Sequence, residues 1–157
     1  MKTVCIAHNI RSVHNIGSIF RTADSSGVQT LYLTGYSPTP HDRFGNIRSD
    51  IKKVALGAEE KVSWNYEKDP LPLVRRLKRE GFLICAIEQH PSSLPYTKLK
   101  EFSNKDIAFI LGNEVDGIED SIIKEVDMVF EIPMSGDKES LNVSVVAGII
   151  FFRRRDA

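Results

Sequence analysis

The segment from Asn9 to Val28 contains an asparagine and an arginine placed to act on a polar substrate. Arg21 follows Asn15 by six residues and lies among apolar residues at helical spacing. We expect an arginine in this position to be at least half buried, so that it needs an anionic partner. That partner is either a substrate phosphate or one of the protein's own carboxylates. Asn15 could instead serve only as the N-cap of the helix.

The segment Phe109–Ile118 places Gly112, Asn113 and Glu114 directly after an apolar run. A turn at the end of a strand offers free backbone amides and carbonyls to a ligand. Taken alone, the pattern is a weak indication of a site, because Gly-Asn turns are common.

The segment Ile132–Val145 combines a proline, a polar loop and then Ser140 and Asn142 before a second apolar run. Ser140 could simply be a helix N-cap. Asn142 is harder to explain in this way, since a buried side-chain amide must be hydrogen-bonded.

Short apolar strands alternate along the chain with amphipathic helices, and these elements must position the three segments. Strands are expected at residues 3–7, 30–34, 61–66, 82–88, 107–111 and 128–132. Helices are expected at residues 15–26, 70–80 and 118–126, the first ending at Gly27 and the second at Gly81. Residues 141–152 fit either a strand or a buried helix. The alternation predicts an α/β fold with a mostly parallel sheet flanked by helices.

The charge of the chain is balanced overall but uneven along its length. The formal net charge is zero, whereas residues 1–57 carry +4 and residues 101–140 carry −8. A local basic face is enough to attract nucleic acid, so zero net charge does not exclude that partner. The alternative is a solvated surface with no partner.

Nothing in the sequence indicates a metal site, a membrane span or a secretory signal. Cys5 and Cys85 both lie in apolar runs and are expected to be buried thiols, and no His or Cys cluster has zinc-like spacing. The longest apolar run is too short to span a bilayer. We therefore expect one cytoplasmic domain over residues 1–157, with no appended RNA-binding domain.

Together and in order, the three segments resemble the three motifs of the SpoU/TrmH family of RNA 2′-O-ribose methyltransferases, within the SPOUT superfamily. The first matches through Asn15, Arg21 and Gly27, and Lys53–Ala58 also resembles a family stretch. The remaining matched positions lie in the second and third segments: Gly112, Asn113, Glu114, Gly117, Pro133, Met134, Ser140, Leu141 and Asn142. The likeness covers about residues 8–152.

The resemblance implies an α/β fold with a deep C-terminal trefoil knot, homodimers, and S-adenosylmethionine bound by the knotted loops. Composition could not have predicted the knot, because knots are nearly absent from proteins. By match, the cofactor-binding residues are Leu111, Gly112, Asn113, Ile132, Pro133, Met134 and Leu141. The implied reaction transfers a methyl group to a ribose 2′-hydroxyl of tRNA or rRNA.

The same resemblance implies a catalytic group around Arg21, made of Asn15, Glu114, Ser140 and Asn142. Arg21 could act as a general base, or it could bind a phosphate and stabilise the developing alkoxide. The second role fits better with a guanidinium pKa above about 12.

Many relatives carry an added RNA-binding domain or basic extensions, and this chain shows neither. Its expected RNA contacts are Arg11, Arg43, Arg48, Lys52 and Lys53. The tail Arg153–Arg155 could add to them or be a solvated chain end. Weak RNA affinity, or dependence on an accessory RNA-binding protein, would follow.

Three alternatives stand beside the methyltransferase. One is a family member that binds RNA or cofactor without catalysis. A second is an unrelated Rossmann-type enzyme, although no Gly-x-Gly-x-x-Gly or Walker-type loop is present. The third is a purely structural α/β protein, which would leave Arg21, Glu114 and Asn142 without a joint role.

Overall fold

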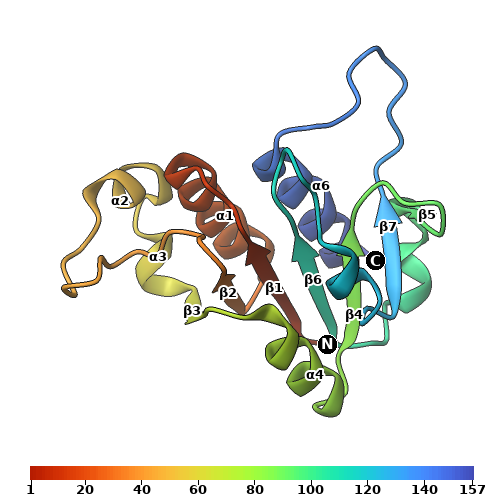
Figure 1. Ribbon diagram of the computed structural model, residues 1–157, viewed down its shortest axis with the longest axis horizontal. Helices are drawn as coiled ribbons and strands as arrows, with labels where there is room; N and C mark the ends of the chain where they lie inside the picture. The colour runs from red at the N-terminus through yellow and green to blue at the C-terminus, as the bar shows by residue number, and fades with distance from the viewer.

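The computed structural model describes residues 1–157 and contains a seven-stranded sheet in the order β3-β2-β1-β6-β4-β7-β5 (Figure 1). Every neighbouring pair of strands is parallel. The strands are β1 Thr3–His8, β2 Thr30–Thr34, β3 Ser63–Glu67, β4 Leu83–Ile87, β5 Leu94–Pro95, β6 Ile107–Leu111 and β7 Met128–Glu131. The predicted α/β class with a mostly parallel sheet is confirmed.

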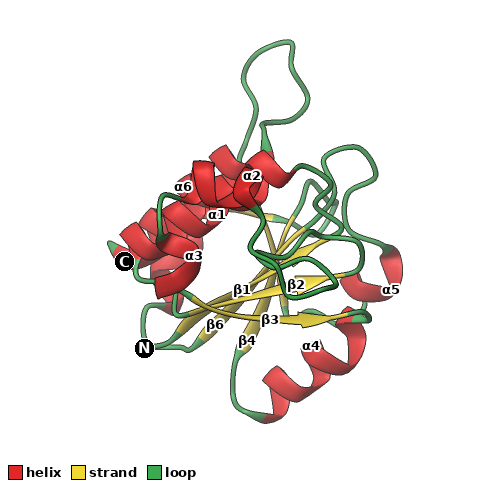
Figure 2. Ribbon diagram, turned by 90° about the vertical axis from the view of Figure 1, so that its left-hand side faces the viewer, coloured by secondary structure: helices red, strands yellow, loops and turns green.

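Helices cover both faces of this sheet (Figure 2). On one face lie α1 Val13–Ser26, α2 Ser49–Ala55, α3 Ala58–Lys61 and α6 Val143–Arg155, and on the other lie α4 Pro70–Arg79 and α5 Asp120–Ile123. A 3-10 helix, η1 Tyr96–Phe102, packs against α6. No helix is both long enough and apolar enough to cross a membrane. The knot implied by the resemblance stays a prediction.

Each buried strand sends alternate side chains into two separate cores. In β1, Cys5 and Ala7 join the core under α1 and α6, whereas Val4 and Ile6 join the core under α4 and α5. Both cysteines are buried and free, and burial raises the pKa of each thiol well above its usual value. They are therefore packing residues, as expected.

The ambiguous run at residues 141–152 is helical. Asn142 caps α6 by accepting a hydrogen bond from the Ser144 amide (2.8 Å), and Gly148 faces Thr22 of α1. Three-sided burial against the sheet, α1 and η1 outweighs the strand preference of the β-branched residues.

Several predicted boundaries were wrong. The N-cap of α1 is Ser12, whose hydroxyl accepts from the Asn15 amide (3.1 Å), so Asn15 is not the cap. Gly27 ends α1 in the left-handed conformation (φ 83°), as predicted. The helix expected at residues 118–126 is confined to Asp120–Ile123, and α2 was not predicted.

The C-terminal arginines are part of the packing of α6. Arg154 is 6% exposed and donates to the carbonyls of Phe102 (3.3 Å), Ser103 (3.2 Å) and Lys105 (2.5 Å). Arg153 donates to the carbonyl of Thr97 (2.9 Å). The interpretation of this tail as a solvated chain end was therefore wrong, since its charges fix α6 to the segment before β6.

We expect Arg154→Met to lower the free energy of unfolding by about 2–4 kcal/mol, because three carbonyls lose their donor in a buried place. Arg155→Met is the matched control, since Arg155 is exposed, pairs with its neighbour Asp156, lies over the Phe152 ring and donates to no buried carbonyl. Its effect should stay within about 0.5 kcal/mol. Denaturant unfolding measures both, and equal midpoints for the two variants would contradict the assignment.

Candidate functional site

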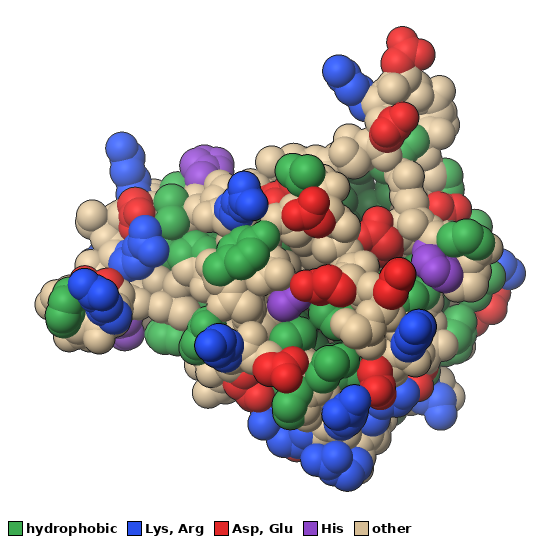
Figure 3. Space-filling model, viewed as in Figure 1, with side chains coloured by type: hydrophobic (Ala, Val, Ile, Leu, Met, Phe, Trp, Pro, Cys, Tyr) green, Lys and Arg blue, Asp and Glu red, His purple; other side chains and the backbone are tan.

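A pocket of about 480 Å³ lies at the carboxyl ends of β4, β6 and β7, beside the long loop between β7 and α6. It is visible as a hollow at the base of the loop that projects at the top of Figure 3. Its volume is typical of a small-molecule site, and its position is where open parallel sheets bind ligands. Apolar walls come from Ile87, Leu111, Ile132, Val143 and Val146.

Six of the seven residues predicted to bind a cofactor line this pocket. They are Leu111, Gly112, Asn113, Ile132, Met134 and Leu141. Pro133 is exposed and does not line it. Segments 20 residues apart in the sequence therefore meet because β6 and β7 both flank β4.

The pocket wall formed by residues 112–118 is a backbone surface with no room for side chains at its glycines. A Cβ atom on Gly112 would lie 2.5 Å from Cγ1 of Ile118, and Gly117 has a positive φ of 70°. The side-chain oxygen of Asn113 accepts from the amides of Val115 (2.8 Å) and Asp116 (2.9 Å). Such a turn exposes main-chain polar groups to a ligand.

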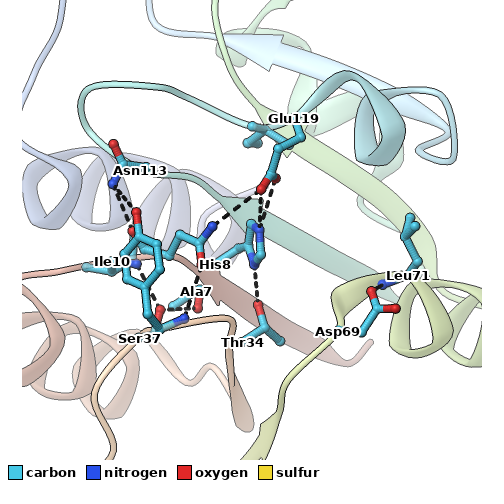
Figure 4. Close-up of polar contacts among 12 residues, drawn as sticks. Ala7, His8, Ile10, Thr34, Ser37, Asp69, Leu71, Asn113 and Glu119 are labelled. Carbon is cyan, nitrogen blue, oxygen red and sulfur yellow. Dashed lines mark hydrogen bonds and ion pairs between the residues drawn. The ribbon is translucent and has the colours of Figure 1, made fainter.

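Side chains from two strands fasten this wall in place (Figure 4). The His8 ring bonds the Thr34 hydroxyl through Nδ1 (2.8 Å) and faces the Glu119 carboxylate through Nε2 (3.0 Å). Glu88 accepts from the Ile118 amide (3.0 Å). Because His8 and Thr34 are buried at the ends of β1 and β2, the wall is held against the sheet itself.

Asn113 adds a third attachment. Its amide nitrogen donates to the Asn9 carbonyl (3.1 Å) and to the Tyr36 hydroxyl (2.8 Å). The sequence analysis missed His8, Tyr36, Glu88 and Glu119. The available signal was that His8 and Glu88 each end or follow a strongly apolar strand, as Asn113 does.

Asn15 and Glu114, predicted together in the catalytic group, are in contact. The side-chain amide of Asn15 donates to the Glu114 carboxylate at 2.8 Å, although 99 residues separate them. Asn15 is buried, Glu114 is exposed, and Glu114 lines the pocket. This contact joins the first turn of α1 to the rim of the pocket.

Arg21 and Asn142 occupy different surroundings from those expected. Arg21 is exposed on α1, lines no part of the pocket and forms no ion pair, so the prediction of a half-buried arginine was wrong. Its position on α1 turns it away from the apolar face that packs on the sheet. Asn142 is likewise exposed, as the cap of α6, while Ser140 lines the pocket.

Carboxylates dominate the charge of the pocket, and no Lys or Arg lines it. The acidic lining residues are Glu88, Glu114, Asp116, Asp120, Glu131 and Glu139. No group of three or more His, Cys, Asp or Glu side chains in the structure is placed to hold a metal ion. The pocket therefore favours a cationic organic ligand and repels a phosphate-bearing one.

The predicted RNA contacts lie outside the pocket. Arg11 stacks over the Tyr36 ring (5.7 Å) and Arg43 over the Phe44 ring (4.8 Å). Lys52 and Lys53 are exposed on α2, and Arg48 pairs with Asp50 (2.8 Å).

This fold and site define a parallel α/β protein with a small-molecule pocket at the carboxyl edge of its sheet. The chain matches the model of the SpoU rRNA Methylase family over residues 2–152, and it belongs to that family. The expected family resemblance is thereby confirmed.

Curated relatives include the 23S rRNA (guanosine-2′-O-)-methyltransferases RlmB of Neisseria meningitidis, 32% identical over 96% of this chain, and of Nitrosomonas europaea, 31% identical over 94%. The chain spans 56% and 53% of their lengths. Among solved structures, that of the A. aeolicus TrmH/SpoU tRNA modifying enzyme aligns with a TM-score of 0.85 and 27% identity, covering 99% of this chain and 74% of that one. An AdoMet-bound rRNA methyltransferase from Sinorhizobium meliloti shares the fold, with a TM-score of 0.88 and 22% identity over 99% of this chain and 56% of that one.

We expect Gly112→Ala to lower the free energy of unfolding by about 1–3 kcal/mol, because the added methyl group must displace Ile118 or the backbone of Gly117. Gly136→Ala is the control, since a Cβ there meets no atom within 4 Å. It should change stability by less than about 0.5 kcal/mol. A stability of Gly112→Ala equal to that of the control would show that the wall is not tightly packed.

Proposed function

We propose that this protein is an S-adenosylmethionine-dependent methyltransferase that methylates a ribose 2′-hydroxyl of tRNA or rRNA. One observation carries the proposal: a pocket lined by six carboxylates and by no Lys or Arg adjoins the Asn15–Glu114 contact at the carboxyl edge of the sheet. Membership of the SpoU family and the activity for which the RlmB relatives are named support it. Their names and that of the A. aeolicus structure include both rRNA and tRNA, so the proposal covers both.

The residues of the pocket fit S-adenosylmethionine. The molecule carries a sulfonium and an ammonium cation and one carboxylate, so that its net positive charge matches the six carboxylates of the pocket, and its adenine matches the apolar walls. The backbone of residues 111–113 and 132–134, with Leu141, would hold it. When bound, it supplies an activated methyl group. A dinucleotide, with its phosphates, fits this lining poorly, which disfavours the Rossmann-type alternative.

The side chains have distinct roles in this proposal. Asn15 fixes the Glu114 carboxylate at the rim of the pocket, where it can accept a hydrogen bond from a ribose hydroxyl. Ser140 lines the same pocket, and the Asn142 side chain keeps the start of α6 in place beside it. Holding the hydroxyl in line with the donor supplies much of the rate in such a transfer.

Arg21 requires a second subunit in this scheme. It lines no part of its own chain's pocket, yet it is exposed and free of ion pairs. Val115, Leu141 and Val145 are exposed around the pocket (86%, 38% and 48%), as expected of a surface that another copy covers. We propose a homodimer in which Arg21 of each copy binds phosphate or stabilises alkoxide charge at the other copy's pocket.

Calorimetric titration with S-adenosylmethionine, beside S-adenosylhomocysteine, tests the cofactor. We expect saturable binding with one site per chain, and no binding of NAD under the same conditions. Absence of binding by the folded protein would remove the methyltransferase proposal. Binding without transfer to any RNA would favour the non-catalytic alternative.

We expect Arg21→Ala to abolish methyl transfer, because the guanidinium would no longer stabilise charge at the reacting oxygen. Its free energy of unfolding should stay within about 0.5 kcal/mol of that of the unchanged protein, because the side chain is exposed. Asp24→Ala, also exposed on α1, is the control and should keep its activity.

Mixing Arg21→Ala with Glu114→Ala should restore about a quarter of the activity through mixed dimers with one complete site. Unchanged turnover in Arg21→Ala would refute its role, and failure of the mixture to regain activity would refute the shared site.

A further inference from the structure

The loop before α2 presents an aromatic ring to solvent at a well-ordered tip. Phe44 is 73% exposed, the highest value for any phenylalanine in the chain. Its neighbours from His41 to Ile47 are exposed as well, and His41 and Ile47 form a β-bridge that closes the loop. In Figure 1 this loop forms the end of the molecule farthest from β7, beyond α2.

Hydrogen bonds to Asp42 make the tip rigid. Its carboxylate accepts from the amides of Phe44 (2.8 Å) and Asn46 (2.9 Å), and its own amide donates to the Asn46 carbonyl (2.9 Å). The Asn46 amide, above all, holds the pKa of Asp42 below its usual value. Gly45 supplies the positive φ of 80° that the turn requires. The backbone that carries the ring is thus fixed before any partner binds, which lowers the entropic cost of binding.

The surroundings of Phe44 are cationic. The Arg43 guanidinium lies 4.8 Å from the centre of the ring, which leaves the opposite face of the ring for another planar group. Lys52 and Lys53 follow on α2 without ion pairs. Both nearby acids are engaged, Asp42 with the turn and Asp50 with Arg48. Figure 3 shows basic and hydrophobic side chains together at this end of the molecule.

A similar pair connects the loop with the pocket. Arg11 lies over the Tyr36 ring, and the Tyr36 hydroxyl accepts from Asn113 in the pocket wall (2.8 Å). The chain runs from Tyr36 directly into the loop that ends at Phe44. Two aromatic rings therefore lie on one segment, Tyr36 beside the pocket and Phe44 at the tip, and each has an arginine against it.

We propose that Phe44 and Arg43 form a stacking platform for an unpaired base of the RNA, with Lys52 and Lys53 beside its phosphates. This inference rests on the proposed function, which makes RNA the substrate, and it names where the RNA is held away from the pocket. Aromatic rings flanked by cations bind single-stranded nucleic acid by stacking, with little sequence preference. A second copy of this chain is a poorer occupant, because a two-fold contact here would place like cations against one another.

The test measures binding of a fluorescein-labelled, mixed-sequence single-stranded RNA by anisotropy. Phe44→Ala should weaken binding about 10-fold or more, whereas Phe44→Trp should retain it. Lys52→Ala and Lys53→Ala should each reduce by about one the number of ions released on binding, as measured by the slope of log affinity against log salt concentration. Phe44→Ala should leave that slope unchanged. Arg79→Ala, exposed on α4 at the other face of the sheet, is the control for a lost cation and should bind normally.

S-adenosylmethionine titration and gel filtration of Phe44→Ala separate the possible failures. Unchanged cofactor binding and an unchanged oligomeric state are expected. Equal RNA affinity of Phe44→Ala and the unchanged protein would overturn the platform and leave the proposed function standing. No RNA binding by the unchanged protein would overturn both, and a change of oligomeric state in Phe44→Ala would assign the ring to a contact between copies.

Discussion

β6 lies between β1 and β4 in the sheet, and the pocket wall of residues 112–118 depends on this placement. The chain forms β4 and β5 before it returns to fill the place beside β1, so the turn after β6 emerges next to His8 and Asn9. Those residues, with Thr34 of the adjoining strand, hold the turn by hydrogen bonds (Figure 4). The backbone surface of residues 112–118 owes its shape to this attachment, because a short glycine-containing turn has no core of its own.

The site that results is asymmetric in charge. Carboxylates line the pocket, while Arg21 on α1, Lys52 and Lys53 on α2 and Arg43 on the loop before α2 all lie outside it. A cationic small molecule and a polyanion can therefore approach the same protein without competing for one surface. Zero net charge is consistent with this division, since attraction depends on the local field. The exposed position of Arg21 extends the same division, because it leaves the pocket of its own chain with no Lys or Arg in its lining.

The polar contacts explain why the pocket and the basic loop can act together. Asn113 contacts both the pocket wall and Tyr36, and Tyr36 begins the segment that ends at Phe44. Tyr36 is half exposed, and hydrogen bonds to Asp42 order the turn at the exposed tip. RNA held at the tip would lie on the same stretch of chain as Tyr36, which contacts the pocket wall.

The sequence by itself determined six of the seven strands, the class of fold, the end of α1 at Gly27 and the three polar segments, because local periodicity and turn chemistry report these features directly. The two-residue strand β5 was not predicted. It also determined the family, through residues such as Asn15, Glu114 and Ser140 at matched spacing. Only the tertiary structure decided that residues 143–155 form a helix, that Arg154 is a buried packing residue and that Arg21 is exposed. It alone brought His8 to Glu119 and Asn15 to Glu114, because the order of strands in a sheet, which sets such distant contacts, is fixed by global packing and leaves no periodic signal in the chain.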